Sequence, residues 1–194
     1  LREEQVTKGG LTYRERRACL KALLKSLRGH REDLVAAVDA DFGSRSAVET
    51  YLAECYPVVT AIKHALAELS EWMAPRSRSV QWPFLPATAE VVYQPLGVVG
   101  VIAPWNYPVT TSLGPIVAAI SAGNRVLLKP SEETPRTTAV LTKILEQGIG
   151  TDIVRVIPGG VETGRAFARL PFDHILFTGS TEVGRKVMEA ASGN

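Results

Sequence analysis

The stretch that decides the fold is Val98-Val99-Gly100-Val101-Ile102-Ala103-Pro104-Trp105-Asn106-Tyr107-Pro108. Five of its first six residues are apolar, and four of those are β-branched. A short apolar run of this kind, bounded by Gly97 and Pro104, predicts a strand that is buried on both faces, as in a parallel sheet. Pro104 cannot donate a hydrogen bond to a neighbouring strand, so the strand ends there. Asn106 therefore lies just beyond the carboxyl end of a strand, where open α/β sheets bind their ligands.

Strand and helix patterns alternate from this stretch onward. Further strands are predicted at 125–129, 153–157 and 174–177, and helices at 109–121, 134–147, 162–169 and 181–191. Together with the strand at 98–103, these strands alternate with helices and predict a parallel, doubly wound sheet with right-handed crossovers. The predicted fold class is therefore α/β with a Rossmann-like sheet, preceded by an N-terminal helical segment.

The chain before the sheet predicts helices followed by a linker. Helices are expected at 13–28, 32–41 and 47–73, and the third carries an apolar stripe at Leu52, Cys55, Val59, Ile62, Leu66 and Leu69, with Pro57 as the candidate site of a kink. Residues 76–87 are rich in proline and predict an extended linker, and 89–93 predict a short strand at an edge or in a hairpin. We therefore divide the chain into N-terminal helices and linker at 1–87 and a sheet domain at 88–194.

Composition excludes several classes of partner. The 194 residues are 45% hydrophobic and 22% charged, with a formal net charge of +2, as in an ordinary globular protein. This charge is too near zero to indicate nucleic acid or an anionic membrane surface as a partner. No apolar stretch reaches the roughly 18 residues that a membrane span requires. The charged start at Leu1–Glu4, with no apolar stretch after it, predicts no signal peptide.

The cysteines and histidines predict neither a metal site nor a nucleophile. Only Cys19 and Cys55 are present, which excludes a disulfide framework and favours a reducing compartment and a cytoplasmic location. Both fall on or beside apolar stripes, with no neighbouring histidine or helix start to favour a thiolate. His64 lies between the apolar positions of its helix and is predicted to be a surface residue. His174 could act as a base, but its position before the last strand favours the edge opposite the ligand.

Polar residues or glycines follow each of the other strands, and parallel strands bring all these ends to one edge of the sheet. After the last strand, Thr178-Gly179-Ser180 precedes a helix. Gly179 allows the backbone to approach a ligand closely, and Ser180 can cap the helix start, where an anion such as a pyrophosphate is favoured. Taken alone, the same residues favour an ordinary N-cap turn, and they lack the Gly-x-Gly-x-x-Gly spacing of the usual dinucleotide site.

Lys129 and Glu132 follow the second strand of the sheet. A lysine and a glutamate at this spacing could bind the two hydroxyls of a ribose from both sides. A carboxylate favours an unphosphorylated ribose and a cation eases a 2′-phosphate, so these residues leave both NAD and NADP open. The alternative is a solvated salt bridge at the start of the helix at 134–147, where acidic residues are favourable.

Asn106 has two alternative roles. Its side-chain NH2 could donate to an oxyanion that develops in an acyl-transfer step, an interaction typically worth about 2.7–4 kcal/mol. Alternatively, its side chain caps the helix that follows it. The residues alone favour the cap.

Taken together, these motifs resemble those of the aldehyde dehydrogenase superfamily. The segments that match in order and spacing are Pro104–Pro108, Ala122–Asn124, Leu128–Glu132 and Phe177–Gly184, and the resemblance extends over nearly the whole chain. Phe42–Ser46 with Glu49, and Pro171–His174, look most like the coniferyl-aldehyde dehydrogenase branch. The resemblance implies an oxidoreductase with NAD or NADP as cofactor, an aldehyde as substrate and a homo-oligomeric assembly, a dimer or tetramer.

The resemblance also assigns roles to individual residues. It implies that Asn106 helps to form the oxyanion hole and that Ser180 contacts the pyrophosphate. Lys129 and Glu132 would hold the adenosine ribose, Gly159 or Gly160 would lie beside the adenine, and the backbone of 102–105 would line the nicotinamide. The full set of implied cofactor-binding residues is Ile102, Ala103, Pro104, Trp105, Lys129, Ser131, Glu132, Gly159, Gly160, Gly179, Ser180 and Val183.

One departure from the superfamily pattern concerns the chemistry itself. Complete enzymes that this chain resembles oxidise an aldehyde to the acid through a cysteine thiohemiacetal, with hydride passing to NAD(P)+. Their general base is a glutamate in a Glu-Leu-Gly-Gly-Lys stretch and their nucleophile a cysteine in a separate catalytic domain, and neither motif occurs here. Cys19 and Cys55 do not match the nucleophile's context.

We therefore expect an incomplete aldehyde dehydrogenase fold that is inactive alone. In this interpretation 88–194 form a partial NAD(P)-binding domain and the catalytic domain is absent. The alternative is a non-catalytic nucleotide-binding or assembly module, which would share all the same sequence features.

Overall fold

The apolar runs predicted as strands form one four-stranded sheet in the computed structural model, which describes residues 1–193. The strands are β3 (Val98–Ile102), β4 (Arg125–Lys129), β5 (Val154–Val156) and β6 (His174–Phe177). They lie in the order β5-β4-β3-β6, and every neighbouring pair is parallel. The strand order therefore reverses between β3 and β6, as in a Rossmann-like fold. The α/β prediction is confirmed.

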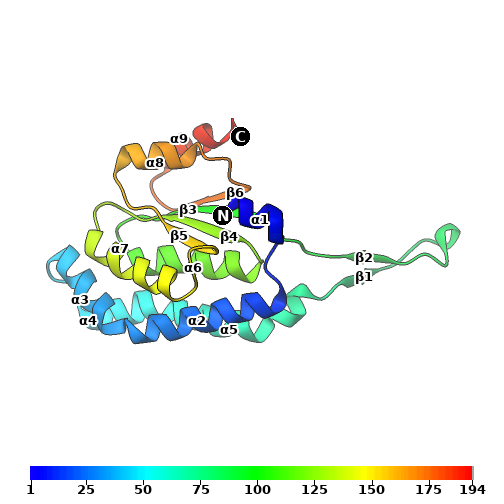
Figure 1. Cartoon of the computed structure of the whole chain (residues 1–194), viewed down its shortest axis with the longest axis horizontal. Coiled ribbons are helices and arrows are strands. Elements are labelled where there is room, and N and C mark those ends of the chain that lie inside the picture. The colour runs from blue at the N-terminus through cyan, green and yellow to red at the C-terminus, as the bar shows by residue number, and fades with distance from the viewer. Residues whose placement is uncertain (194) are drawn as a thin grey trace.

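Each strand is followed by a helix, and the helices cover both faces of the sheet (Figure 1). They are α6 (Pro108–Ser121), α7 (Pro135–Thr142, continued by a π-helical turn at Lys143–Gln147), α8 (Val161–Ala168) and α9 (Thr181–Ala191). In Figure 1, α6 and α7 lie below the sheet, whereas α8 and α9 lie above it. Every one of these strands and helices agrees with its predicted range to within one residue at each end.

A glycine in the middle of β3, Gly100, lets the ring of Phe172 pack closely against the sheet. A Cβ added at Gly100 would lie 2.8 Å from the ring of Phe172. Phe172 in turn contacts Phe167 of α8, with ring centroids 4.9 Å apart. Any larger residue at position 100 would therefore displace the aromatic pair that covers this face of the sheet.

The N-terminal segment adds further helices. They are α1 (Arg2–Lys8), α2 (Tyr13–Gly29), α3 (Arg31–Phe42), α4 (Ala47–Glu49), a π-helical turn at Thr50–Cys55, and α5 (Tyr56–Met73). Those from α2 to α5 form a layer below α6 and α7, whereas α1 lies at the level of the sheet (Figure 1). A capping box between Thr12 and Glu15 starts α2. The leucines of α2, the stripe of α5 and the buried face of α6 belong to one hydrophobic core. Within residues 1–193, none of the helices has both the length and the apolar character needed to cross a membrane.

The predicted stripe of the third helix is wrong at Leu52, which is 57% exposed. The cause is the π-helical turn at Thr50–Cys55, whose i→i+5 hydrogen bonds change the angle between successive side chains. Cys55, Ile62 and Leu69 are buried as predicted, with Val58 and Ala65 between them, while Val59 and Leu66 are half-buried. Pro57 lies in the first turn of α5, directly after the π-helical turn.

Helix α6 is held at its C-terminal end by a buried arginine of α2. Arg16 is 6% exposed, and its guanidinium donates to the carbonyl oxygens of Leu11, at 2.7 Å, and Ser121, at 3.0 Å. Ser121 is the last residue of α6, so a positive charge lies at the negative end of the helix dipole.

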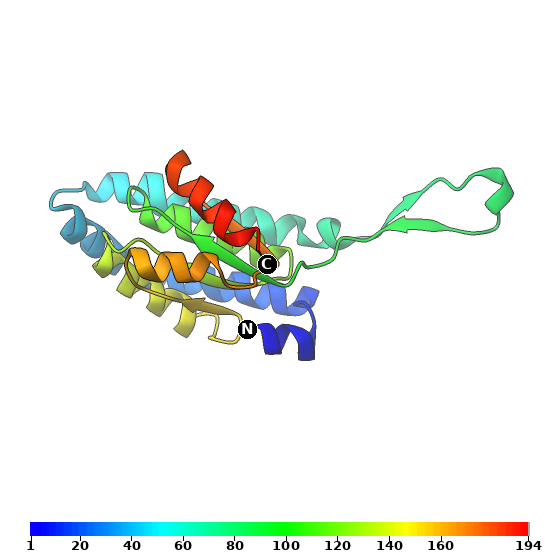
Figure 2. The same ribbon diagram turned by 90° about the horizontal axis from the view of Figure 1, so that it is seen from above.

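The proline-rich segment forms a hairpin arm that extends away from the body of the molecule (Figures 1 and 2). Its strands β1 (Arg76–Arg78) and β2 (Ala89–Val91) are antiparallel, which confirms the hairpin alternative for the predicted strand at 89–93. A short 3-10 helix, Trp82–Phe84, lies near the tip. The expected boundary between residues 87 and 88 falls within this arm, and the division into two domains stays a prediction.

Candidate functional site at the carboxyl edge of the sheet

The carboxyl ends of the four strands meet at one edge of the sheet, as predicted. Ile102 pairs in register with Lys129 on one side and with Phe177 on the other. Hydrogen bonds continue past the strand ends, from the amide of Ala103 to the carbonyl of Lys129, at 3.1 Å, and from the amide of Thr178 to the carbonyl of Ile102, also at 3.1 Å. The turns after β3, β4 and β6 therefore start side by side, and the turn after β5 adjoins that after β4.

Carboxylates from the N-terminal helices occupy the starts of both helices below the sheet. The Glu54 carboxylate accepts a hydrogen bond from the backbone amide of Val109 at 2.6 Å, in the first turn of α6. The Asp41 carboxylate accepts one from the amide of Thr137 at 2.8 Å, in the first turn of α7. An incoming anion would be repelled at these two helix starts.

The helices above the sheet also have a glutamate in the first turn, Glu162 in α8 and Glu182 in α9. These glutamates pair with Arg165 and Lys186 of their own helices, and within the described residues no carboxylate accepts from the backbone amides at either helix start. Gly160 is the N-cap of α8 and provides no side-chain acceptor. Ser180 is the N-cap of α9, as predicted, and its hydroxyl accepts from the amide of Val183 at 3.4 Å. A helix start that lacks a bound carboxylate favours an anionic ligand. The two faces of the same edge therefore differ in their helix starts: carboxylates bind the amides of α6 and α7, whereas the amides of α8 and α9 stay open to a phosphate.

Two glycines bring the backbone close to its neighbours on this face. A Cβ added at Gly159, where φ is +148°, would lie 2.3 Å from the side chain of Thr163. One added at Gly179 would lie 2.5 Å from the ring of Phe177. Neither position has room for a side chain. Gly179 is exposed and Gly159 is half-buried, so a ligand at these turns meets backbone atoms rather than a side chain.

Lys129 and Glu132 form a salt bridge, as one alternative predicted, but it is not a solvated one because Lys129 is buried. Lys129 Nζ lies 2.8 Å from Glu132 Oε2, and their side chains are 6% and 37% exposed. The hydrogen bond from Lys129 lowers the pKa of Glu132, so its carboxyl stays ionised. The pair does not exclude ribose binding, because an ammonium has three donors and a carboxylate has two oxygens. The neighbouring Ser131 hydroxyl accepts from the amide of Glu133 at 3.2 Å.

The cap alternative for Asn106 is wrong. The N-cap position of α6 is Tyr107, without a side-chain hydrogen bond, and Glu54 supplies the capping oxygen instead. Asn106 is exposed, and within residues 1–193 its side chain has no hydrogen-bond partner. Its backbone carbonyl accepts a hydrogen bond from Arg45 Nη1 at 2.8 Å. The side-chain amide is therefore free to meet a ligand at the edge of the sheet.

Comparisons with known proteins identify the family. The model of the aldehyde dehydrogenase family matches residues 2–194. The chain belongs to this family. It is 51% identical, over 175 residues, to a probable coniferyl aldehyde dehydrogenase of Pseudomonas aeruginosa, a match that covers 90% of this chain and 37% of the relative. It is 37% identical over 194 residues to a coniferyl aldehyde dehydrogenase of another Pseudomonas strain, a match that covers 100% of this chain and 40% of the relative.

Solved structures of the family have the same fold. Staphylococcus aureus AldH in its substrate-bound state superposes with a TM-score of 0.95 and 32% identity, covering 100% of this chain and 42% of that one. The chain thus spans about two fifths of the length of these relatives. Aldehyde dehydrogenases are oxidoreductases that use NAD or NADP, so the resemblance drawn from the motifs is confirmed at the level of the family.

The remaining chemical candidates lie where they were predicted. His174 is exposed at the amino end of β6, opposite the edge that carries Asn106. Cys19 and Cys55 are buried and free, and burial raises the pKa of both thiols to about 11. Neither is a thiolate at neutral pH, so neither can replace the family's nucleophile.

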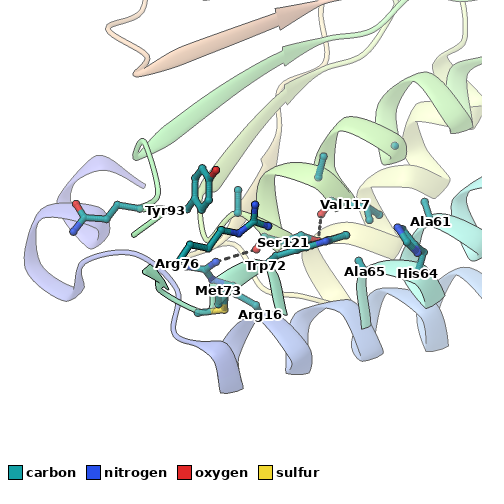
Figure 3. A pocket seen from close by; sticks show the side chains of 14 residues that line it. Arg16, Ala61, His64, Ala65, Trp72, Met73, Arg76, Tyr93, Val117 and Ser121 are labelled. Carbon is teal, nitrogen blue, oxygen red and sulfur yellow. Dashed lines mark hydrogen bonds between the residues drawn. The ribbon is translucent and has the colours of Figure 1, made fainter. Parts of the chain in front are cut away.

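A separate cavity of about 570 Å³ lies between α5, α6 and the base of the hairpin arm (Figure 3). Its lining includes Trp72, Tyr93 and Val117, and the exposed His64 meets the Trp72 ring edge-on at 5.5 Å between centroids. His64 is therefore a surface residue, as predicted. None of the predicted site residues lines this cavity.

Sequence reasoning missed Glu54 and Arg45 as parts of the site. Glu54 is completely buried, and this burial raises the pKa of its carboxyl against the opposing hydrogen bonds of Val109 and Arg45. The one local signal was a glutamate directly before Cys55 on an apolar stripe.

Proposed function

We propose that this chain forms the cofactor-binding part of an NAD(P)+-dependent aldehyde dehydrogenase, with an aromatic aldehyde of the coniferyl type as substrate. The observation that carries the proposal is the gathering of Asn106, the Lys129–Glu132 pair and Ser180 at one edge of a Rossmann-like sheet. The substrate class is supported by the names of the two Pseudomonas relatives. A cytoplasmic location is part of the proposal and is supported by the two free cysteines.

The residues present fit a dinucleotide. The uncapped start of α8, the Ser180 cap of α9 and the side-chain-free turns at Gly159 and Gly179 would receive the adenine and pyrophosphate on the α8–α9 face. Val183 lies in the first turn of α9, beside the same site. When bound, NAD(P)+ supplies the hydride acceptor.

The ribose and nicotinamide would lie nearer β3 and β4. We infer that Glu132 accepts from the ribose hydroxyls and that Lys129 donates to them. The backbone of 102–105 would line the nicotinamide, with the turn after β3 as its floor. Trp105 is 54% exposed and packs against Phe42, with ring centroids 6.1 Å apart, so it can shield one side of the site from water.

Asn106 supplies the chemistry that this chain offers to the substrate. Its side-chain NH2 would donate to the oxygen of the aldehyde as negative charge develops there. The attacking thiol must come from outside these residues, because both cysteines are buried and protonated. The 194-residue chain alone is therefore expected to bind cofactor without turnover.

The gene sequence after Asn194 tests the proposal most directly. A Glu-Leu-Gly-Gly-Lys stretch followed by a cysteine nucleophile, and NAD(P)H formation from coniferyl aldehyde by the product of the whole gene, would support it. A stop codon at that point, with cofactor binding but no turnover, would instead support a non-catalytic nucleotide-binding module. NAD(P)H formation from an aldehyde by the 194-residue chain alone would contradict the proposal.

Replacing Glu132 with alanine should raise the dissociation constant of the cofactor about two- to tenfold, since one hydrogen bond at a partly exposed site contributes about 0.5–1.5 kcal/mol. Titration calorimetry with NAD+ and NADP+ measures the effect on each. Glu133→Ala is the matched control, because the neighbouring residue is also exposed and has no salt bridge in the described chain. Equal affinities for wild type and Glu132→Ala would remove Glu132 from the site.

The homo-oligomer implied by the family is supported by the hairpin arm. Three large apolar side chains near its tip are exposed: Trp82 at 83%, Phe84 at 65% and Leu85 at 60%. Exposed apolar side chains gathered in one place are typical of a surface that binds another protein. We expect Trp82→Ser with Phe84→Ser to convert the assembled protein to monomers in light-scattering measurements. Val6→Ser, at a position 80% exposed on α1, should leave the mass unchanged. An unaltered oligomer in the arm variant would show that the arm is not the interface.

A further inference from the structure

We propose that Arg45 and Glu54 are positioning residues that hold the backbone of Asn106 where its side chain can meet the oxyanion. The inference rests on the proposed role of Asn106. It concerns two residues that lie outside the sheet, in the loop after α3 and in the π-helical turn before α5.

Arg45 provides the direct contact with Asn106. Its Nη1 donates to the Asn106 carbonyl oxygen at 2.8 Å, and this is the hydrogen bond that fixes Asn106 among the described residues. The guanidinium lies over the ring of Phe42, at 3.9 Å from the centroid, and over that of Tyr107, at 4.9 Å. Arg45 thus holds the peptide between Asn106 and Tyr107, by a hydrogen bond to the first residue and by stacking on the ring of the second.

Glu54 holds Arg45 and the start of α6 at the same time. Its Oε1 lies 3.3 Å from Arg45 Nη1, and its Oε2 accepts from the amide of Val109 at 2.6 Å. Its side chain is 0% exposed and that of Arg45 is 12% exposed, so water screens this pair little. Residues 103–107 have no regular secondary structure. The contact of Arg45 with Asn106 and that of Glu54 with Val109 therefore hold this turn where it enters α6.

The local backbone explains how a glutamate reaches this place. Glu54 lies within the π-helical turn at Thr50–Cys55. The larger number of residues per turn in this segment points Glu54 into the core and leaves Leu52 exposed. π-helical turns inside helices occur frequently at functional sites. An ordinary cap would need only a short side chain next to α6, whereas this arrangement adds a cation that contacts Asn106.

Kinetics of the whole-gene product with a double-mutant cycle test the proposal. Arg45→Met keeps the bulk that packs on Phe42 and Tyr107 but removes the donor to Asn106. We expect it to lower kcat for aldehyde oxidation about 10- to 100-fold, as small misplacements of reacting groups do, with the dissociation constant of NAD(P)+ unchanged. Arg45→Lys retains one donor and should restore part of kcat. In an Asn106→Ala background, Arg45→Met should cause no further loss, because it acts through the missing amide.

Controls separate positioning from stability. Asp41→Asn weakens the matching cap of α7, which carries no contact to Asn106, and should lower the melting temperature without lowering kcat. If Arg45→Met does not fold, the double variant Arg45→Met with Glu54→Gln is used in the cycle instead. This double variant removes both partners of the buried ion pair, so neither charge is left without its partner.

The possible failures are distinguishable. A wild-type protein that oxidises no aldehyde contradicts the proposed function. A wild type that is active, with Arg45→Met losing as much in the Asn106→Ala background as in the wild type, overturns the positioning role alone. A kcat that Arg45→Met leaves unchanged also overturns the positioning role.

Discussion

Glu54→Ala is expected to lower the free energy of unfolding by about 3–5 kcal/mol, the usual cost of removing one partner from a buried ion pair. The substitution leaves the Arg45 guanidinium, 12% exposed, without its buried carboxylate. It also removes the acceptor for the amide of Val109, so a buried donor at the start of α6 loses its partner. Because a domain is stable by only about 5–15 kcal/mol, this loss would be a large share of the total.

Urea denaturation followed by circular dichroism measures this loss as a lower midpoint. Glu49→Ala is the matched control: Glu49 also faces Arg45, at 3.8 Å, but its side chain is 45% exposed. Exposed pairs contribute about 0–1 kcal/mol, so the control should change the midpoint little. A Glu54→Ala variant as stable as Glu49→Ala would show that the buried pair adds no stability.

The strands and the helices after them could be predicted because their signals are local. The apolar run of β3 needs no distant partner to be recognised, and Pro104 ends it. Ser180 precedes α9 and caps it by its own hydroxyl, an interaction that spans three residues. The edge at which the site residues gather also follows, since it depends only on the strands being parallel.

The carboxylate caps that distinguish the two faces of that edge could not be predicted. They depend on Glu54 reaching Val109, which is 55 residues away, and on Asp41 reaching Thr137, which is 96 residues away. Helical periodicity also assumes a constant angle per residue, so it could not reveal the π-helical turn that buries Glu54 and exposes Leu52. The sequence favoured a cap by the nearby Asn106, because a capping oxygen that comes from Glu54, 55 residues before Val109, leaves no local signal.

Because Asn106 does not cap α6, a substitution of its side chain should affect catalysis and leave the fold unchanged. In the whole-gene product, Asn106→Ala should lower kcat about 10²- to 10³-fold, equivalent to about 2.7–4 kcal/mol of transition-state stabilisation, if its NH2 is an oxyanion donor. The stability of the folded chain should not change, because this exposed side chain has no hydrogen bond within residues 1–193. The affinity for NAD(P)+ should also stay the same.

Asn106→Asp distinguishes donation from size. Aspartate has the same shape but presents only acceptor oxygens when ionised, and its charge opposes the oxyanion, so kcat should fall at least as far as in Asn106→Ala. Steady-state and single-turnover kinetics with one aldehyde measure both variants, and chemical denaturation verifies that each remains folded. If both variants keep kcat within about fivefold of wild type, a loss of only about 1 kcal/mol, the oxyanion is stabilised elsewhere. If Asn106→Ala instead lowers stability and leaves kcat unchanged, the residue is structural, and the Arg45 contact serves the fold rather than the reaction.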